Sequence, residues 1–182
     1  MCKKKLKIYL ACGLTHVPRK AFADYVEFLN NLATHLPIAL PVSIKYALRD
    51  SDPRLSSKPF GDRARLCYIW DREMVEEADL VIGEASYPST GLGIELQVAC
   101  SADTPIILLF RKAKELQAPP VDYSTPDAER HNLQVGEGYI SLMALGLPSV
   151  FRVVPYTHYT DAMIGVKDAM SAVLRSSPGG ET

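Results

Sequence analysis

The chain has 182 residues, enough for one domain with a substantial core. Hydrophobic residues make up 47% of it and charged residues 23%, which are ordinary proportions for a globular protein. Its 20 basic and 21 acidic residues give a formal net charge of -1. This balance argues against a nucleic-acid polymer as partner, because proteins that bind one usually carry a basic excess.

The first third of the chain predicts a strand, an amphipathic helix and a second strand. Residues 6–12 are a short apolar run that stops at Gly13, as a buried strand does. From Lys20 onward apolar residues recur at i, i+3, i+4 and i+7, which predicts a helix that Pro37 ends. After it we expect a strand at 38–42 and a long loop at 43–61.

The remainder of the chain continues this alternation. A helix is predicted over 62–78, followed by a strand over 79–84 that is almost wholly apolar, as a central parallel strand should be. A glycine-containing turn then leads into another helix. The elements predicted after it are a buried strand at 105–110, a long segment at 111–137 that would suit a mobile flap, a short helix at 139–145, a strand at 149–154 and a last helix at 160–174.

Strands and helices alternate five times, which is typical of a three-layer α/β domain with a five-stranded parallel sheet, of the Rossmann or flavodoxin-like kind. We expect one domain over 1–175 and a disordered tail over 176–182. Ligands of such sheets bind beyond the carboxyl ends of the strands. Three segments meet there: the loop after Tyr9, the turn at 85–95 and the segment after Phe110.

Cysteines and histidines show no metal-ligand spacing; they are Cys2, Cys12, Cys67, Cys100, His16, His35, His131 and His158. Free thiols in a reducing compartment are the simplest interpretation, and we expect no metal and no other cofactor. The N-terminus is too charged for a signal peptide, and no apolar stretch approaches the roughly 20 residues of a membrane span. A soluble cytoplasmic protein is therefore expected, with no membrane partner.

The stretch YPSTGLGIEL at 87–96 joins the third predicted strand to a helix through a tight glycine turn. We expect Glu95 in the first turn of that helix, where the macrodipole favours its ionised form. Beside a ligand, an ionised carboxylate is a nucleophile, a base or a hydroxyl anchor. The alternative is a plain turn followed by a favourable first-turn charge.

Common cofactor motifs are missing from the chain. A dinucleotide fingerprint needs G-x-G-x-x-G after the first strand, whereas here the glycines follow the third strand and Leu96 replaces the third glycine. A P-loop and a G-x-S-x-G serine elbow are also absent. What remains is a pair of carboxylates, Glu95 and Asp71, with Tyr9 at a strand end. Asp71 lies at the edge of an apolar helix face, so it is either a rim charge or a buried group with a partner.

Three stretches carry a resemblance to a known family: KIYLACG at 7–13, WDREMVEEADLVI at 70–82 and PSTGLGIEL at 88–96. Together they resemble the nucleoside 2-deoxyribosyltransferase superfamily, whose members cleave the N-glycosidic bond between a base and a (deoxy)ribose. The resemblance implies that Glu95 is the nucleophile on the anomeric carbon. It also implies that Asp71 assists proton transfer to or from the base, and that Tyr9 positions or tunes the nucleophile.

Two serines are similar to the 2′-deoxynucleoside 5′-phosphate N-hydrolase branch of this superfamily. Transferases that act on free nucleosides carry an Asp where this chain has Ser89 and an Asn where it has Ser141. A serine hydroxyl can bind a 5′-phosphate that an Asp would repel. In that branch the second serine comes from the neighbouring subunit, so the resemblance implies a homodimer with shared active sites. The implied contacts to a small nucleotide or nucleoside are Cys12, Gly13, Ser89, Gly91, Gly93 and Ser141.

The loop after the first strand departs from that branch, which carries a Ser and an Arg there. This chain reads GLTH at 13–16, with Arg19 further on. Either His16 or Arg19 replaces the cationic partner of the phosphate, or the substrate carries no phosphate. Three functions therefore stay open: hydrolysis of a (deoxy)nucleoside 5′-monophosphate, base exchange between nucleosides, and a nucleotide-binding sensor without turnover. A flavodoxin-like redox domain is a weaker alternative.

Overall fold

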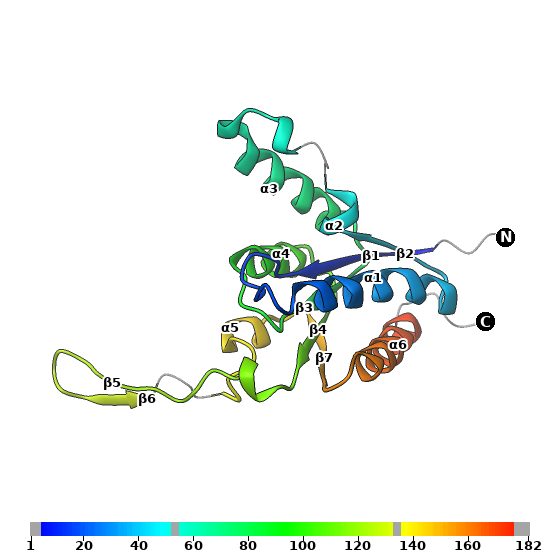
Figure 1. Cartoon of the computed structure of the whole chain (residues 1–182). Helices are drawn as coiled ribbons and strands as arrows, with labels where there is room; N and C mark the ends of the chain where they lie inside the picture. The colour runs from blue at the N-terminus through cyan, green and yellow to red at the C-terminus, as the bar shows by residue number, and fades with distance from the viewer. Residues whose placement is uncertain (1–4, 52–54, 133–135, 177–182) are drawn as a thin grey trace.

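The computed structural model describes residues 5–51, 55–132 and 136–176. Its centre is a five-stranded sheet in the order β2-β1-β3-β4-β7, in which every neighbouring pair is parallel (Figure 1). The strands are β1 (Leu6–Cys12), β2 (Val42–Tyr46), β3 (Leu80–Glu84), β4 (Ile106–Arg111) and β7 (Val150–Tyr156). The predicted α/β class and the predicted five-stranded parallel sheet are confirmed.

Helices cover both faces of the sheet and complete the three layers. On one face lie α1 (Phe22–Ala39) and α6 (Tyr159–Ser176), and on the other lie α3 (Phe60–Glu76) and α4 (Thr90–Ser101). The shorter elements are α2 (Ala47–Asp50), η1 (Leu55–Ser57), η2 (Lys114–Leu116) and α5 (Leu142–Leu145).

The strands contribute side chains to two separate cores, because successive side chains point to opposite faces of the sheet. In β1, Ile8 and Leu10 join the core beneath α1 and α6, whereas Tyr9 and Ala11 join the core beneath α3 and α4. Burial of each large apolar side chain contributes about 1.5–3 kcal/mol. This alternation sends the Tyr9 side chain toward α4 and places it in the layer that carries Asp71 and Glu95.

The strand order reverses between β1 and β3. The chain moves from β1 to β2 on one side and then crosses to β3 on the other side, in the flavodoxin-like order. Loops that leave two such strands diverge and open a crevice at their carboxyl ends. Cys12 and Glu84 are paired at that edge, one at the end of each strand. The topology therefore indicates a ligand site between the loop after β1 and the turn after β3.

The predicted end of the first helix at Pro37 was wrong. Helix α1 runs through Pro37 to Ala39, and the Leu40 amide still donates to the Leu36 carbonyl at 3.0 Å. Pro37 lies in the last turn, where its missing N–H removes only one intrahelical bond. The strand predicted at 38–42 begins instead at Val42.

The long loop predicted at 43–61 was also wrong in its first half. Residues 42–46 form the edge strand β2, with a strict alternation of buried and exposed side chains. Helix α2 and the short helix η1 follow it. The polar residues Ser43 and Lys45 resemble a loop in composition, but they are the solvent-facing half of an edge strand.

The segment predicted as a possible flap at 111–137 contains an antiparallel hairpin. Its strands are β5 (Asp122–Ser124) and β6 (Arg130–Asn132), which extend away from the sheet (Figure 1). Helix α6 continues to Ser176, and the rest of the predicted tail lies outside the described residues.

Candidate active site

A direct hydrogen bond joins two of the candidate residues that are 86 positions apart in the sequence. The Tyr9 hydroxyl donates to Glu95 Oε1 at 2.7 Å. Tyr9 is 1% exposed, because β1 lies inside the sheet and the Tyr9 ring is covered by the α3/α4 layer. The contact fixes one carboxylate oxygen of Glu95, and among the described residues no donor is seen for the other, Oε2.

Glu95 lies one turn deeper in its helix than the sequence predicts. Helix α4 begins at Thr90, and Ser89 is its N-cap, so Glu95 falls in the second turn. The prediction of a first-turn carboxylate was wrong because Gly91 and Gly93 belong to the helix rather than to a turn before it. The macrodipole acts mainly in the first turn, so it contributes little to the ionisation of Glu95.

Burial sets the acidity of Glu95. Loss of solvent raises the pKa of this carboxyl to about 7, and the negative charge of Asp71 acts in the same direction. The hydrogen bond from Tyr9 opposes both effects, because it stabilises the ionised form. Near neutral pH, Glu95 therefore exists in both protonation states.

Asp71 is held by two donors that the sequence did not point to. The Ser51 hydroxyl donates to Asp71 Oδ1 at 2.9 Å, and the Cys67 thiol donates to Asp71 Oδ2 at 3.4 Å. Cys67 precedes Asp71 by four residues in α3, and side chains at this spacing are neighbours on a helix. Ser51 follows α2, inside the segment predicted as a loop, so no pattern in the sequence singled it out.

Asp71 and Glu95 line the same cavity, of about 240 Å³, between α3 and α4. Its other walls include Cys67, Tyr68 and Gly91. The structure thus brings together Tyr9, Asp71 and Glu95 as a group of one phenol and two carboxyls. This set can place an ionisable carboxyl on one side of a small ligand and a second carboxyl beside it.

The loop after β1 packs tightly against the turn after β3. A Cβ atom on Gly13 would lie 2.8 Å from Ser89 Cβ and 3.0 Å from the Tyr87 carbonyl oxygen, so a side chain there would force the two segments apart. The Ser89 hydroxyl accepts a hydrogen bond from the Leu92 amide at 3.1 Å and caps α4. Gly13 and Ser89 therefore lie side by side, and the Ser89 hydroxyl already has a structural partner.

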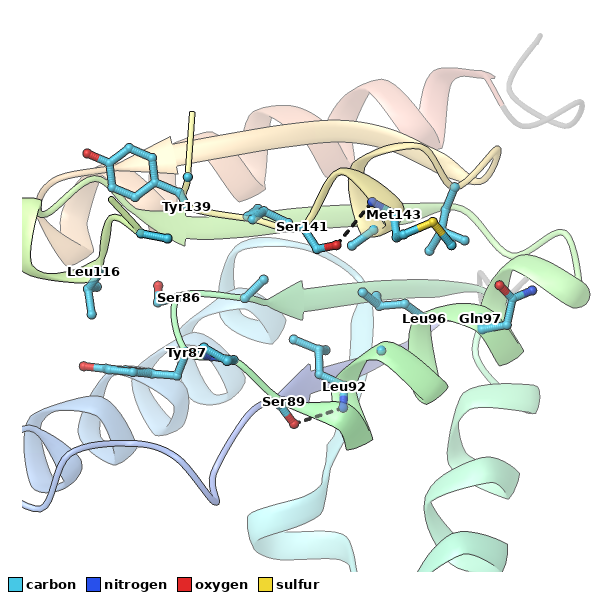
Figure 2. A pocket seen from close by; sticks show the side chains of 18 residues that line it. Ser86, Tyr87, Ser89, Leu92, Leu96, Gln97, Leu116, Tyr139, Ser141 and Met143 are labelled. Carbon is cyan, nitrogen blue, oxygen red and sulfur yellow. Dashed lines mark hydrogen bonds between the residues drawn. The ribbon is translucent and has the colours of Figure 1, made fainter. Parts of the chain in front are cut away.

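A second cavity, of about 510 Å³, lies on the other face of α4. Its walls include Ser89, Gly93, Tyr139 and Ser141 (Figure 2). Ser141 caps the short helix α5 by accepting from the Met143 amide at 3.2 Å. Within one chain, Ser141 thus shares a cavity with Ser89 and lies across α4 from the cavity that holds Glu95.

The two glycines of α4 leave its first turn bare. A Cβ on Gly93 would meet nothing within 4 Å, and one on Gly91 would meet only the Ser89 hydroxyl oxygen at 3.7 Å. No neighbour among the described residues requires a glycine at either position, whereas glycine costs about 1 kcal/mol within a helix. The open backbone suits close approach of a ligand.

Cys12 and the cationic candidates occupy different surroundings. Cys12 is half-buried at the end of β1, and burial followed by the charge of Glu95 raises the pKa of its thiol. His16 and Arg19 are exposed in the loop after β1. Neither side chain is among the described residues that line the two cavities.

The described residues offer no cluster of three or more His, Cys, Asp or Glu side chains that could hold a metal ion. Cys12, Cys67 and Cys100 are free thiols. Among the helices of residues 5–51, 55–132 and 136–176, none is long and apolar enough to cross a membrane.

No family model matches the chain. Over 104 residues, which are 57% of this chain and 67% of the relative, it is 27% identical to a protein of Thermofilum pendens. The name of that relative assigns it, provisionally, to the 2′-deoxynucleoside 5′-phosphate N-hydrolases.

Two solved structures share the fold. A conserved protein of Enterococcus faecalis superposes with a TM-score of 0.61 at 16% identity, covering 91% of this chain and 99% of its own. The CMP N-glycosidase of Clostridium botulinum superposes with a TM-score of 0.50 at 15% identity, covering 88% and 97%. At these identities the two superpositions show a shared fold.

Proposed function

We propose that this protein is an N-glycosidase that hydrolyses a (deoxy)nucleoside 5′-monophosphate to a free base and a sugar 5-phosphate. The observation that carries the proposal is the Tyr9–Glu95 hydrogen bond beside a cavity that Asp71 also lines. The provisional name of the Thermofilum pendens relative supports the same reaction.

Glu95 is assigned the role of nucleophile at the anomeric carbon. Departure of the base leaves an oxocarbenium-like sugar, which a close carboxylate stabilises or traps. Tyr9 holds Oε1 at 2.7 Å, so the attacking oxygen in this assignment is Oε2. Water then attacks the anomeric carbon and breaks its bond to Glu95, while Asp71, which has given its proton to the base, takes one proton from the water. This releases the sugar 5-phosphate and restores the Glu95 carboxylate.

Asp71 is assigned the proton transfer that the leaving base requires. Both of its oxygens accept hydrogen bonds, from Ser51 and Cys67, so its carboxyl plane is fixed relative to α3. In this role Asp71 acts as the general acid toward the leaving base. Glu95, whose pKa burial raises to about 7, lines the same cavity, so both carboxyls face one small ligand.

The phosphate is assigned to Ser89, to the bare first turn of α4 and to Ser141 of the partner subunit. Ser141 of the same chain lines the larger cavity with Ser89 and lies across α4 from Glu95, so this assignment takes the Ser141 on the Glu95 side from a second copy. Helix α5 presents Leu142 and Met143 to solvent, and Met143 is 83% exposed. This apolar surface supports a homodimer with shared sites, and the free thiols suit a cytoplasmic setting.

The test is a substrate panel. The purified protein is incubated with ribo- and deoxynucleosides and with their 5′-monophosphates, each with and without a second base, and products are separated by chromatography. Base release from monophosphates alone, with no new nucleoside formed, is the expected result. Exchange on unphosphorylated nucleosides would overturn the proposal in favour of a transferase, and binding without any release would favour a sensor.

A further inference from the structure

A second glutamate, Glu84, lies fully buried at the end of β3 and is not used by the chemistry above. It is 0% exposed and lies on the α1/α6 side of the sheet, opposite to Tyr9 and Glu95. No salt bridge to it is seen among the described residues. A buried carboxyl without a cation costs several kcal/mol unless hydrogen bonds compensate it.

Hydroxyl groups from three elements supply that compensation. Tyr25 of α1 donates to Glu84 Oε2 at 2.5 Å, and Tyr156 of β7 donates to Oε1 at 2.9 Å. The Ser86 hydroxyl makes a further short hydrogen bond to Oε1, and the Ser86 amide lies 3.4 Å from Oε2. Burial raises the pKa of Glu84, while these donors act against the rise.

The same cluster ties the turn after β3 to the end of β4. Ser86 Oγ accepts from the Arg111 amide at 2.8 Å while it bonds Glu84. Ser86 opens the stretch 86–89 that forms one wall of the larger cavity and ends at the α4 cap, Ser89 (Figure 2). Ser86 is therefore three residues along the chain from the N-cap of the helix that carries Glu95.

We propose that Glu84 is a positioning residue for the proposed active site: with Tyr25, Tyr156 and Ser86 it fixes the turn at 86–89, and thereby the start of α4 and the placement of Glu95. This role rests on the proposed function for its kinetic consequence, although the positioning itself does not require turnover. Displacement of a reacting group by about 1 Å costs up to about 100-fold in rate.

The experiment compares Glu84→Gln and Tyr156→Phe with Val166→Ala. A glutamine has one acceptor oxygen in place of two, and a phenylalanine keeps the ring of Tyr156 but loses its donor. Val166, on α6, is 0% exposed in the same core and lies outside the cluster, so its variant supplies a loss of stability without a change at the turn. The measurements are the melting temperature, kcat and KM for base release from a monophosphate, and hydrogen exchange of the amides at 85–92.

We expect Glu84→Gln and Tyr156→Phe to lower kcat about tenfold or more at temperatures where they remain folded, and to speed exchange at 85–92. Val166→Ala should lower the melting temperature and leave kcat and that local exchange unchanged. If Glu84→Gln does not fold, Tyr156→Phe decides by the same readouts. The proposal is overturned if kcat and exchange in the folded variants match those of Val166→Ala. A wild-type protein without activity would sink the proposed function alone, and the exchange measurement would still decide the role of Glu84.

Discussion

The Tyr9 hydroxyl lies 2.7 Å from Glu95 Oε1 and connects the middle of β1 to the second turn of α4. The contact has a chemical consequence, because a donor to a carboxylate favours its ionised form. Burial and the charge of Asp71 act in the opposite direction and raise the pKa of Glu95 to about 7. In the proposed mechanism, Tyr9 therefore helps to keep the attacking carboxylate ionised at neutral pH.

Tyr9→Phe should weaken catalysis most strongly below neutral pH. Loss of the donor raises the pKa of Glu95 further. The midpoint of the increase in kcat/KM with pH should therefore shift to higher pH by about one unit. The measurement is the pH profile of kcat/KM for base release, with Tyr123→Phe on the exposed hairpin strand β5 as the control. An unchanged midpoint in Tyr9→Phe would contradict the role given to this hydrogen bond.

The raised pKa of Glu95 also predicts a pH-dependent cost in stability. The unfolded chain ionises Glu95 near its ordinary value of 4.5, whereas the folded chain ionises it at about 7. Stability associated with this group is thus fully present below pH 4.5 and is lost as pH rises through 7. Glu95→Gln removes the loss, so it should stabilise the protein by about 1–3 kcal/mol at pH 8 and by much less at pH 5.

Urea unfolding at the two pH values measures this difference. Glu77→Gln is the control, because Glu77 is exposed and its pKa is lowered by its hydrogen bond to Lys45. That variant should give no gain at pH 8. Equal effects of Glu95→Gln at both pH values would show that Glu95 is not penalised by burial.

Gly13→Ala should separate the loop after β1 from the turn after β3. The added Cβ would lie 2.8 Å from Ser89 Cβ, and overpacking of this kind costs about 1–3 kcal/mol. Gly61→Ala is the matched control, because a Cβ on Gly61 in α3 meets nothing within 4 Å and alanine favours a helix by up to about 1 kcal/mol. The melting temperature and the rate of base release should both be lower in Gly13→Ala than in Gly61→Ala. Equal values in the two variants would refute the close packing.

The proposed sharing of active sites between two subunits predicts complementation between two inactive variants. In a mixed dimer of Glu95→Ala and Ser141→Ala chains, one site combines an intact Glu95 with the intact Ser141 of the partner subunit. Refolding the two variants together should therefore restore about a quarter of wild-type activity. No recovery in a mixture shown to contain mixed dimers would place both residues of each site in a single chain.

The sequence predicts the sheet well because its inner strands are unusual in composition. Central parallel strands are buried on both faces, so β3 and β4 stand out as apolar runs. The edge strand β2 could not be recognised in this way, because Ser43 and Lys45 face solvent. The helix end predicted at Pro37 was wrong because a proline in the last turn of a helix does not end it.

Site residues within one sequence motif could be predicted, whereas residues that meet only through tertiary contacts could not. The motif at 88–96 singles out Glu95, and the structure places Tyr9 and Asp71 beside it. Ser51 and the Glu84 cluster depend on tertiary neighbours, since Ser51 meets a residue 20 positions away and Tyr156 meets one 72 positions away. The structure also places Ser141 across α4 from Glu95, and this separation could not be predicted from the sequence.

The assignment of Glu95 as the nucleophile is tested by comparing base release from the same 5′-monophosphate by the wild type, Glu95→Gln and Glu77→Gln. Both substitutions remove one carboxylate, but only Glu95 faces the cavity beside Asp71. We predict release by the wild type and by Glu77→Gln at similar rates, and a loss of about 10³-fold or more in Glu95→Gln. Equal rates in the wild type and Glu95→Gln would contradict the assignment of Glu95 as the nucleophile.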